Sequence, residues 1–149
     1  MGKDHDDLNK IITYLTKKTT LTLCCVDKEV PYCCNCFYVL NKAKMMLYIT
    51  SSFNTHHANI MLKSQQVAGT INDQARSVAY IQGVQYTGQI TLLNNEDEQQ
   101  ARNLFCQAYP IAKLKEAPMW AITLSMLKMT DNKLGFGKKF LWHRADCET

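Results

Sequence analysis

The chain has 149 residues, of which 46% are hydrophobic and 20% charged, and its formal net charge is +4. These values predict one globular domain over residues 1–149 and argue against disorder, because a chain of this size can bury a sufficient apolar core. The positive charges are scattered, without the Lys/Arg stripe of a nucleic-acid surface, and no apolar run has the ~18–20 residues of a membrane span. We therefore expect neither a nucleic acid nor a membrane as a partner.

The first residues, Met1 to Asp7, are polar and acidic, which is not the composition of a signal peptide. We therefore expect a cytoplasmic protein, in a compartment that keeps thiols reduced.

Hydrophobic periodicity and turn residues divide the chain into short elements. The expected elements are, in chain order, a helix around residues 8–15, strands at 20–27, 31–40 and 45–50, a short helix at 58–63, strands at 66–71 and 77–93, a helix from 94 or 95 to 108, and strands at 119–129 and 135–144. Gly83 and Gly88 are the expected bulges or bends of the long strand.

Six or seven strands thus follow one another mainly through short turns, with helices near both ends. This order predicts a mostly β protein of the α+β kind, in which an antiparallel sheet forms a closed or half-closed barrel with flanking helices. No strand is followed by a glycine-rich loop and a helix, so nothing supports a Rossmann or P-loop nucleotide site.

The chain has seven cysteines, at positions 24, 25, 33, 34, 36, 106 and 147. If residues 28 and 29 form a two-residue hairpin turn, Cys24 lies opposite Cys33, and alternation puts Cys34 and Cys36 on the other face of the hairpin. The thiols are then divided between the two faces of the hairpin. We therefore predict that most of them are small core residues and that there is no metal site. A Cys24–Cys33 redox pair and a metal site remain the alternatives.

The segment from Thr50 to His57 reads Thr-Ser-Ser-Phe-Asn-Thr-His-His and joins a strand end to a helix start. Hydroxyl groups, imidazoles and the free N–H groups of a helix N-terminus are suited to bind a phosphate. The alternative is a polar loop in which Asn54 or Thr55 caps the helix and the two histidines lie at the surface.

Trp142 and Arg144 lie two residues apart on the last strand and so point the same way. An aromatic face beside a guanidinium suits a planar anionic ligand, and it equally suits a tryptophan at the edge of the core. No GxSxG or HExxH motif is present, so the sequence indicates no catalytic residue.

The order of these elements resembles the pyridoxamine 5′-phosphate oxidase-like split β-barrels, which bind FMN. The resemblance rests on the N-terminal helix, the three-strand meander, the Thr/Ser loop that ends in two basic residues before Ala58, a segment that begins Arg76-Ser-Val78, and a late tryptophan. The sequence is more closely similar to the YhbP-like family of uncharacterised bacterial proteins, in the segments 67–71, 78–85 and 130–139.

This resemblance implies a split barrel of six or seven strands and a homodimer with an FMN in each of two interfacial clefts. Two histidines stand where the superfamily has Arg and Lys, so the expected phosphate site is weaker and dependent on pH. The residues expected at the FMN site are Thr50 or Ser51 and Thr55 as hydroxyl donors, His56 and His57 as the basic pair, Asn35 near the position of a strand arginine, Ser77 near a glutamine of the partner subunit, and Trp142.

The function expected from this comparison is FMN binding, with a flavin-dependent oxidoreductase reaction on an unknown small molecule. The alternative is a dimeric binding module without enzymatic activity, whose cleft is empty or holds another planar ligand such as haem. A cysteine-based redox or metal protein is a third interpretation.

Overall fold

The computed structural model describes residues 2–146, so Cys147 lies outside the described residues. All eight strands of this part belong to one antiparallel sheet, which confirms the predicted mostly β split barrel with flanking helices. The elements are α1 (Gly2–Lys17), β1 (Thr20–Asp27), β2 (Val30–Phe37), β3 (Val39–Asn41), β4 (Met46–Thr50), α2 (His56–Lys63), β5 (Gln66–Asn72), β6 (Gln82–Leu92), α3 (Asn95–Ala108), β7 (Met119–Asp131) and β8 (Lys139–His143).

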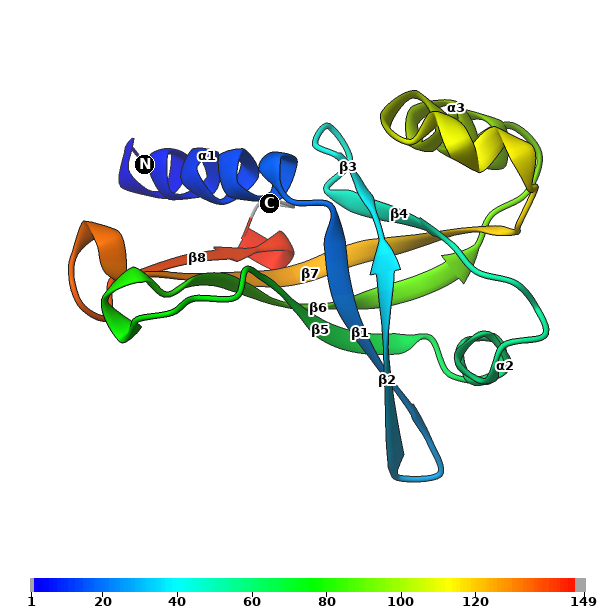
Figure 1. Cartoon of the computed structure of the whole chain (residues 1–149), viewed down its shortest axis with the longest axis horizontal. Coiled ribbons are helices and arrows are strands. Elements are labelled where there is room, and N and C mark those ends of the chain that lie inside the picture. Colours follow the sequence, from blue (N-terminus) through cyan, green and yellow to red (C-terminus); the bar gives the residue numbers. More distant parts are fainter. Residues whose placement is uncertain (1, 147–149) are drawn as a thin grey trace.

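The strands follow the order β2-β1-β5-β6-β7-β4-β3 across the sheet. The long strand β7 pairs along one edge with β6, and its other edge is shared by β4 at one end and β8 at the other. Figure 1 shows that the sheet curls and that the turn end of the β1–β2 hairpin projects beyond the other strands. The strands at the two ends of this order, β2 and β3, are consecutive in the sequence and are separated only by Tyr38.

Helices cover the sheet at two places (Figure 1). Helix α1 packs beside β8 and contributes Ile11 and Leu15, both fully buried, to the main core. Helix α3 contacts β3, β4 and β7, and its Ala101 and Phe105 form a second cluster with Tyr48. No helix of the described residues is long and apolar enough to cross a membrane.

Three of the predicted strands were wrong in extent, and the one expected at 135–144 begins only at Lys139. The strand expected at 31–40 is interrupted at Tyr38, which is 1% exposed and donates a hydrogen bond from its hydroxyl to the carbonyl of Leu15. The strand expected from residue 77 begins at Gln82, because Ser77 instead accepts a hydrogen bond from the backbone of Ala79 and caps a short 3₁₀ turn. The interruption at Tyr38 divides the strand expected at 31–40 into β2 and β3, so the described residues form eight strands instead of the expected six or seven.

The β1–β2 hairpin has the predicted register, in which Cys24 lies opposite Cys33 and Leu23 opposite Cys34. Lys28 and Glu29 form its turn with positive φ angles of 50° and 69°, the conformation that matches the twist of two-residue hairpins. The prediction that most cysteines are core residues holds for Cys25 and Cys106, which are buried. Cys34 and Cys36 are half-buried and pack against the core, whereas Cys24 is half-buried and Cys33 exposed on the other face of the hairpin.

The register of β6 against β7 shifts between Thr87 and Gly88, so the bulge predicted at Gly88 is confirmed. A Cβ atom at Gly88 would lie 2.6 Å from the carbonyl oxygen of Thr123, which is too close. Pairing runs without a shift through Gly83, where we had expected a second irregularity.

Candidate functional site

A cavity of about 440 Å³ opens between the edge strand β2, the end of β4, the start of α2 and the end of α3. Segments far apart in the sequence therefore form its walls. The residues that line it are Asn35, Cys36, Phe37, Thr50, Ser51, Ser52, Thr55, His57, Phe105, Tyr109, Ile111 and Ala112.

Three polar side chains converge at one side of this cavity. The Oγ atom of Ser51 lies 2.5 Å from Nε2 of His57 and 3.4 Å from Oγ1 of Thr55, and the last two atoms are 3.4 Å apart. The Thr55 hydroxyl also accepts a hydrogen bond from the backbone N–H of Ala58, so Thr55 is the N-cap of α2, as the polar-loop alternative expected. The site thus combines hydroxyl groups, an imidazole and the N-terminus of a helix.

Buried Trp120 fixes the loop that carries Ser51. Its indole Nε1 donates a hydrogen bond of 3.0 Å to the carbonyl oxygen of Ser51, and the N–H of Ser51 donates to the carbonyl of Pro118. Trp120 is 1% exposed and its ring packs edge-on against Phe53. Both the carbonyl and the N–H of Ser51 are therefore hydrogen-bonded, to β7 and to the segment before it respectively.

Two causes lower the pKa of the His57 imidazole. Desolvation by burial is the larger one, and the nearby imidazole of His56 adds to it. Both disfavour the charged form, so His57 is neutral at neutral pH in the ligand-free protein. The site then has polar hydrogen-bonding groups but no fixed positive charge from this residue.

Aromatic side chains form another wall of the cavity. The ring of Tyr109 packs against Phe37 at a centroid distance of 5.3 Å and against Phe105 at 4.9 Å, and its hydroxyl donates to the carbonyl of Tyr38. Phe37 is 56% exposed and Ile111 77% exposed, so an apolar surface is presented to solvent beside the polar cluster.

The structure brings together five of the residues predicted at the site, namely Asn35, Thr50, Ser51, Thr55 and His57. The other three do not line the cavity of their own chain. His56 is exposed and packs edge-on against Tyr32, Ser77 caps its 3₁₀ turn, and Trp142 is a buried residue of β8.

Sequence reasoning missed the contribution of Phe105 and Tyr109, because only the fold brings the end of α3 against β2. It also missed the role of Trp120, whose alternating position in β7 indicates burial but not a hydrogen bond to Ser51. The cavity includes Cys36, whose thiol lies 3.9 Å from that of Cys34. The hydrogen bond between these thiols raises the pKa of Cys34 and lowers that of Cys36.

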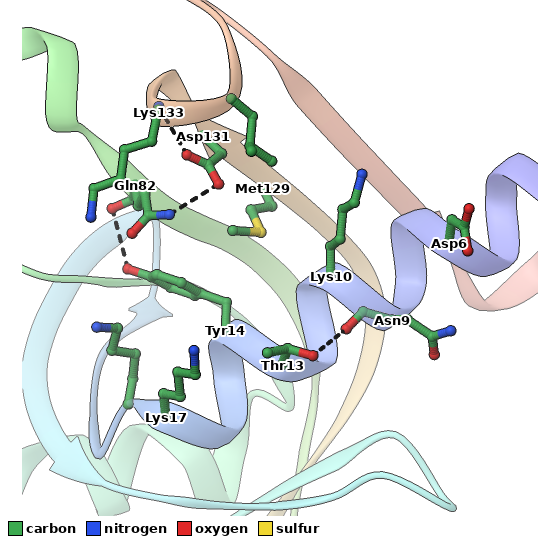
Figure 2. Close-up of a pocket in the computed structure, with 12 residues that line it drawn as sticks. Asp6, Asn9, Lys10, Thr13, Tyr14, Lys17, Gln82, Met129, Asp131 and Lys133 are labelled. Atoms are coloured by element: carbon green, nitrogen blue, oxygen red, sulfur yellow. Dashed lines mark hydrogen bonds between the residues drawn. The ribbon is translucent and has the colours of Figure 1, made fainter.

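Figure 2 shows another cavity, of about 550 Å³, between α1 and the turn after β7. Its polar groups bind one another. The hydroxyl of Tyr14 donates to the carbonyl of Gln82, and the Gln82 amide and the Lys133 backbone both donate to the buried carboxylate of Asp131. These hydrogen bonds attach α1 to the sheet and leave the polar groups already paired with one another. We therefore assign the functional site to the cavity at Ser51.

No protein-family model matches the chain. A UPF0306 protein of Yersinia pestis is 43% identical to it over 141 residues, which cover 95% of this chain and 96% of the relative. The chain belongs to the UPF0306 family. The sequence segments 67–71, 78–85 and 130–139 had indicated an uncharacterised bacterial family, and this match agrees with that resemblance.

Solved structures that resemble the UPF0306 chain are split-barrel proteins of 12–15% sequence identity, so they show its fold alone. A putative pyridoxamine 5′-phosphate oxidase from Listeria innocua has a TM-score of 0.66 and covers 81% of this chain and 95% of its own. A FAD-binding protein from Mesorhizobium loti has a TM-score of 0.66, with 80% and 90% covered, and the haem storage protein HutZ from Vibrio cholerae has 0.65, with 78% and 89% covered. The expected split-barrel fold is therefore confirmed.

Proposed function

We propose that the cavity at Ser51 binds FMN and that this UPF0306 protein is a flavin-dependent oxidoreductase acting on a small molecule. The observation that carries the proposal is the convergence of the side chains of Ser51, Thr55 and His57 beside an apolar, partly aromatic wall. A flavin mononucleotide has a phosphate at one end and a planar ring system at the other. The two kinds of surface in the cavity match these two ends.

The residues present fit the phosphate through hydrogen bonds rather than through charge. The hydroxyl of Ser51 and the imidazole of His57 can donate to phosphate oxygens, and the first turn of α2 offers backbone N–H groups without partners inside the helix. Neither Lys nor Arg is among the residues that line the cavity. We therefore expect moderate FMN affinity.

The apolar wall fits the ring system of the cofactor. A volume of about 440 Å³ lies within the roughly 300–1,000 Å³ of small-molecule sites, and their walls are mainly apolar, as at Phe37 and Tyr109. Bound FMN would supply hydride or electron transfer, while the side chains of the cavity bind it, orient it and exclude water.

We also propose a homodimer, in which a second copy of the chain completes the cleft. The cavity is open, and large apolar side chains are exposed around it and along the neighbouring hairpin, including Val30, Phe37, Phe53 and Ile111. Burial of such residues against a second subunit gives a favourable free energy of association. A cytoplasmic location would keep the cysteines in the reduced form.

A titration with FMN and riboflavin tests the proposal, because riboflavin lacks only the phosphate. Bound flavin is followed by quenching of its fluorescence, in buffer that contains a metal chelator. Wild-type protein should bind FMN at least ~10-fold more tightly than riboflavin, since charge-assisted hydrogen bonds contribute about 1.5–3 kcal/mol each.

His57→Gln and Ser51→Ala should each reduce this preference. His56→Gln is the matched control, because it removes the neighbouring imidazole that does not line the cavity. Equal affinity for FMN and riboflavin in the wild type, or an equal loss in His56→Gln and His57→Gln, would contradict the assignment of the phosphate site.

A further inference from the structure

Two thiols and one imidazole meet beside the cavity, and they come from two different elements. Cys34 and Cys36 lie two residues apart on β2, so both point to the same face, and His57 lies in the first turn of α2. A sulfur from each cysteine and a ring nitrogen of His57 all lie within 4.8 Å of one another. We propose that these three residues bind one Zn²⁺ ion, with the fourth coordination position open to the cavity.

The spacing of the two sulfur atoms supports this site. They are 3.9 Å apart. In tetrahedral coordination with zinc–sulfur bonds of ~2.3 Å, two sulfur ligands are separated by about 3.8 Å. The thiols therefore already have the separation that a shared zinc ion requires, and a ring nitrogen of His57 lies within 4.8 Å of both sulfur atoms.

A disulfide between the same cysteines fits less well. Residues two apart on an extended strand have Cα atoms about 6.6 Å apart, which is close to the ~6.8 Å upper limit for disulfides. Both cysteines are paired with residues of β1, with Cys34 opposite Leu23 and Cys36 opposite Leu21. This pairing resists the change in the β2 backbone that a disulfide bond would need.

The surroundings hold the three ligands in place without closing the site. All three side chains are half-buried, and Cys36 and His57 also line the cavity. Ser51 Oγ lies 2.5 Å from Nε2 of His57, and a hydrogen bond at a ring nitrogen orients the imidazole. Two Cys, one His and one open position match the ligand set of catalytic zinc sites rather than that of closed structural sites.

Binding changes the protonation of the ligands but transfers no electrons. The two thiols bind as thiolates and release their protons to the buffer, and the imidazole binds in its neutral form. The metal site does not require the proposed flavin function, although His57 takes part in both. Cys34, which does not line the cavity, belongs to the metal site alone, and Ser51 belongs to the phosphate site without being a metal ligand.

Cobalt and zinc titrations of the reduced, metal-free full-length protein test the site. Co²⁺ is used as the probe, because thiolate ligands give sulfur-to-cobalt charge-transfer absorption and tetrahedral geometry gives intense d–d bands. Wild-type protein should bind one Co²⁺ per chain with both signals, and one equivalent of Zn²⁺ should displace it. Cys34→Ser, Cys36→Ser and His57→Gln should each weaken binding by at least ~10-fold.

The exposed Cys33 and its cross-strand neighbour Cys24 provide matched controls from the same hairpin. Cys33→Ser and Cys24→Ser should bind Co²⁺ as the wild type does. The inference is overturned if wild-type protein gives no thiolate–cobalt band, or if the band survives in Cys34→Ser and is lost in Cys33→Ser.

Far-ultraviolet circular dichroism verifies that each variant is folded, and an FMN titration separates the two proposals. Cys34→Ser should lose the thiolate–cobalt band and keep its FMN affinity. Ser51→Ala should lose FMN affinity and still give the thiolate–cobalt band at saturating Co²⁺, because both thiolate ligands remain.

Discussion

The hydrogen bond from Trp120 to the Ser51 carbonyl gives a prediction that links the core to the site. Trp120→Phe keeps an aromatic ring at this 1% exposed position but removes the donor, so a buried carbonyl oxygen is left without its partner. Such a loss costs about 1–3 kcal/mol. Removal of part of a large side chain from the core adds a packing cost.

Trp142→Phe supplies the control for packing. The chain has two tryptophans, and Trp142 is a buried core residue that does not contact the Ser51 loop through a hydrogen bond of the described structure. Trp120→Phe should therefore lower the free energy of unfolding by about 1–2 kcal/mol more than Trp142→Phe does. For a domain of this size the difference corresponds to a Tm lower by about 3–6 °C.

Urea denaturation followed by circular dichroism measures the difference, and amide hydrogen exchange locates it. The amide of Ser51 donates to the carbonyl of Pro118 and should exchange faster in Trp120→Phe, but not in Trp142→Phe. Equal destabilisation by the two substitutions, with unchanged exchange at Ser51, would refute the positioning role of Trp120.

Three further predictions concern a glycine of the sheet, the buried Tyr14 and the thiols. Gly88→Ala should lower Tm much more than Gly83→Ala. A Cβ at Gly88 would lie 2.6 Å from a backbone oxygen, whereas at Gly83 the nearest atom is a side-chain carbon at 3.1 Å. Similar melting curves for the two variants would contradict the close approach of the Gly88 backbone to Thr123. Burial raises the pKa of Tyr14 from 10.0 to about 12, so the folded state favours the neutral phenol. The free energy of unfolding therefore falls as the pH rises from about 10 through 12. The urea midpoint of the wild type should therefore fall across that range more steeply than that of Tyr14→Phe. In native alkylation followed by mass spectrometry, exposed Cys33 should react much earlier than Cys25, since burial raises the pKa of Cys25 to about 11. Labelling of these two in the reverse order would contradict the orientation of the hairpin.

Local patterns were sufficient to predict much of the fold. The register of the first hairpin followed from its two-residue turn, and the bulge at Gly88 followed from a glycine inside a strand. The structure differs from the prediction where a contact between distant residues determines the backbone conformation. Tyr38 interrupts the second predicted strand because its side chain is buried against α1, and nothing in the alternation of residues 31–40 indicates that contact.

Only the part of the candidate site that is formed by residues close in the sequence was predicted. Ser51, Thr55 and His57 are close in the sequence, and a strand end leading into a helix start brings them together. The meeting of His57 with Cys34 and Cys36 depends on how α2 sits against β2, which no spacing along the chain encodes. The register of the hairpin alone divides the thiols between two faces, so the sequence predicted no metal site.

The visible absorption spectrum of freshly purified protein, with mass spectrometry of the ligand released on denaturation, tests the central claim most directly. We expect flavin absorbance and the release of FMN, or the appearance of both after incubation with FMN and gel filtration. A haem Soret band, or a colourless protein that retains no FMN after incubation, would contradict it.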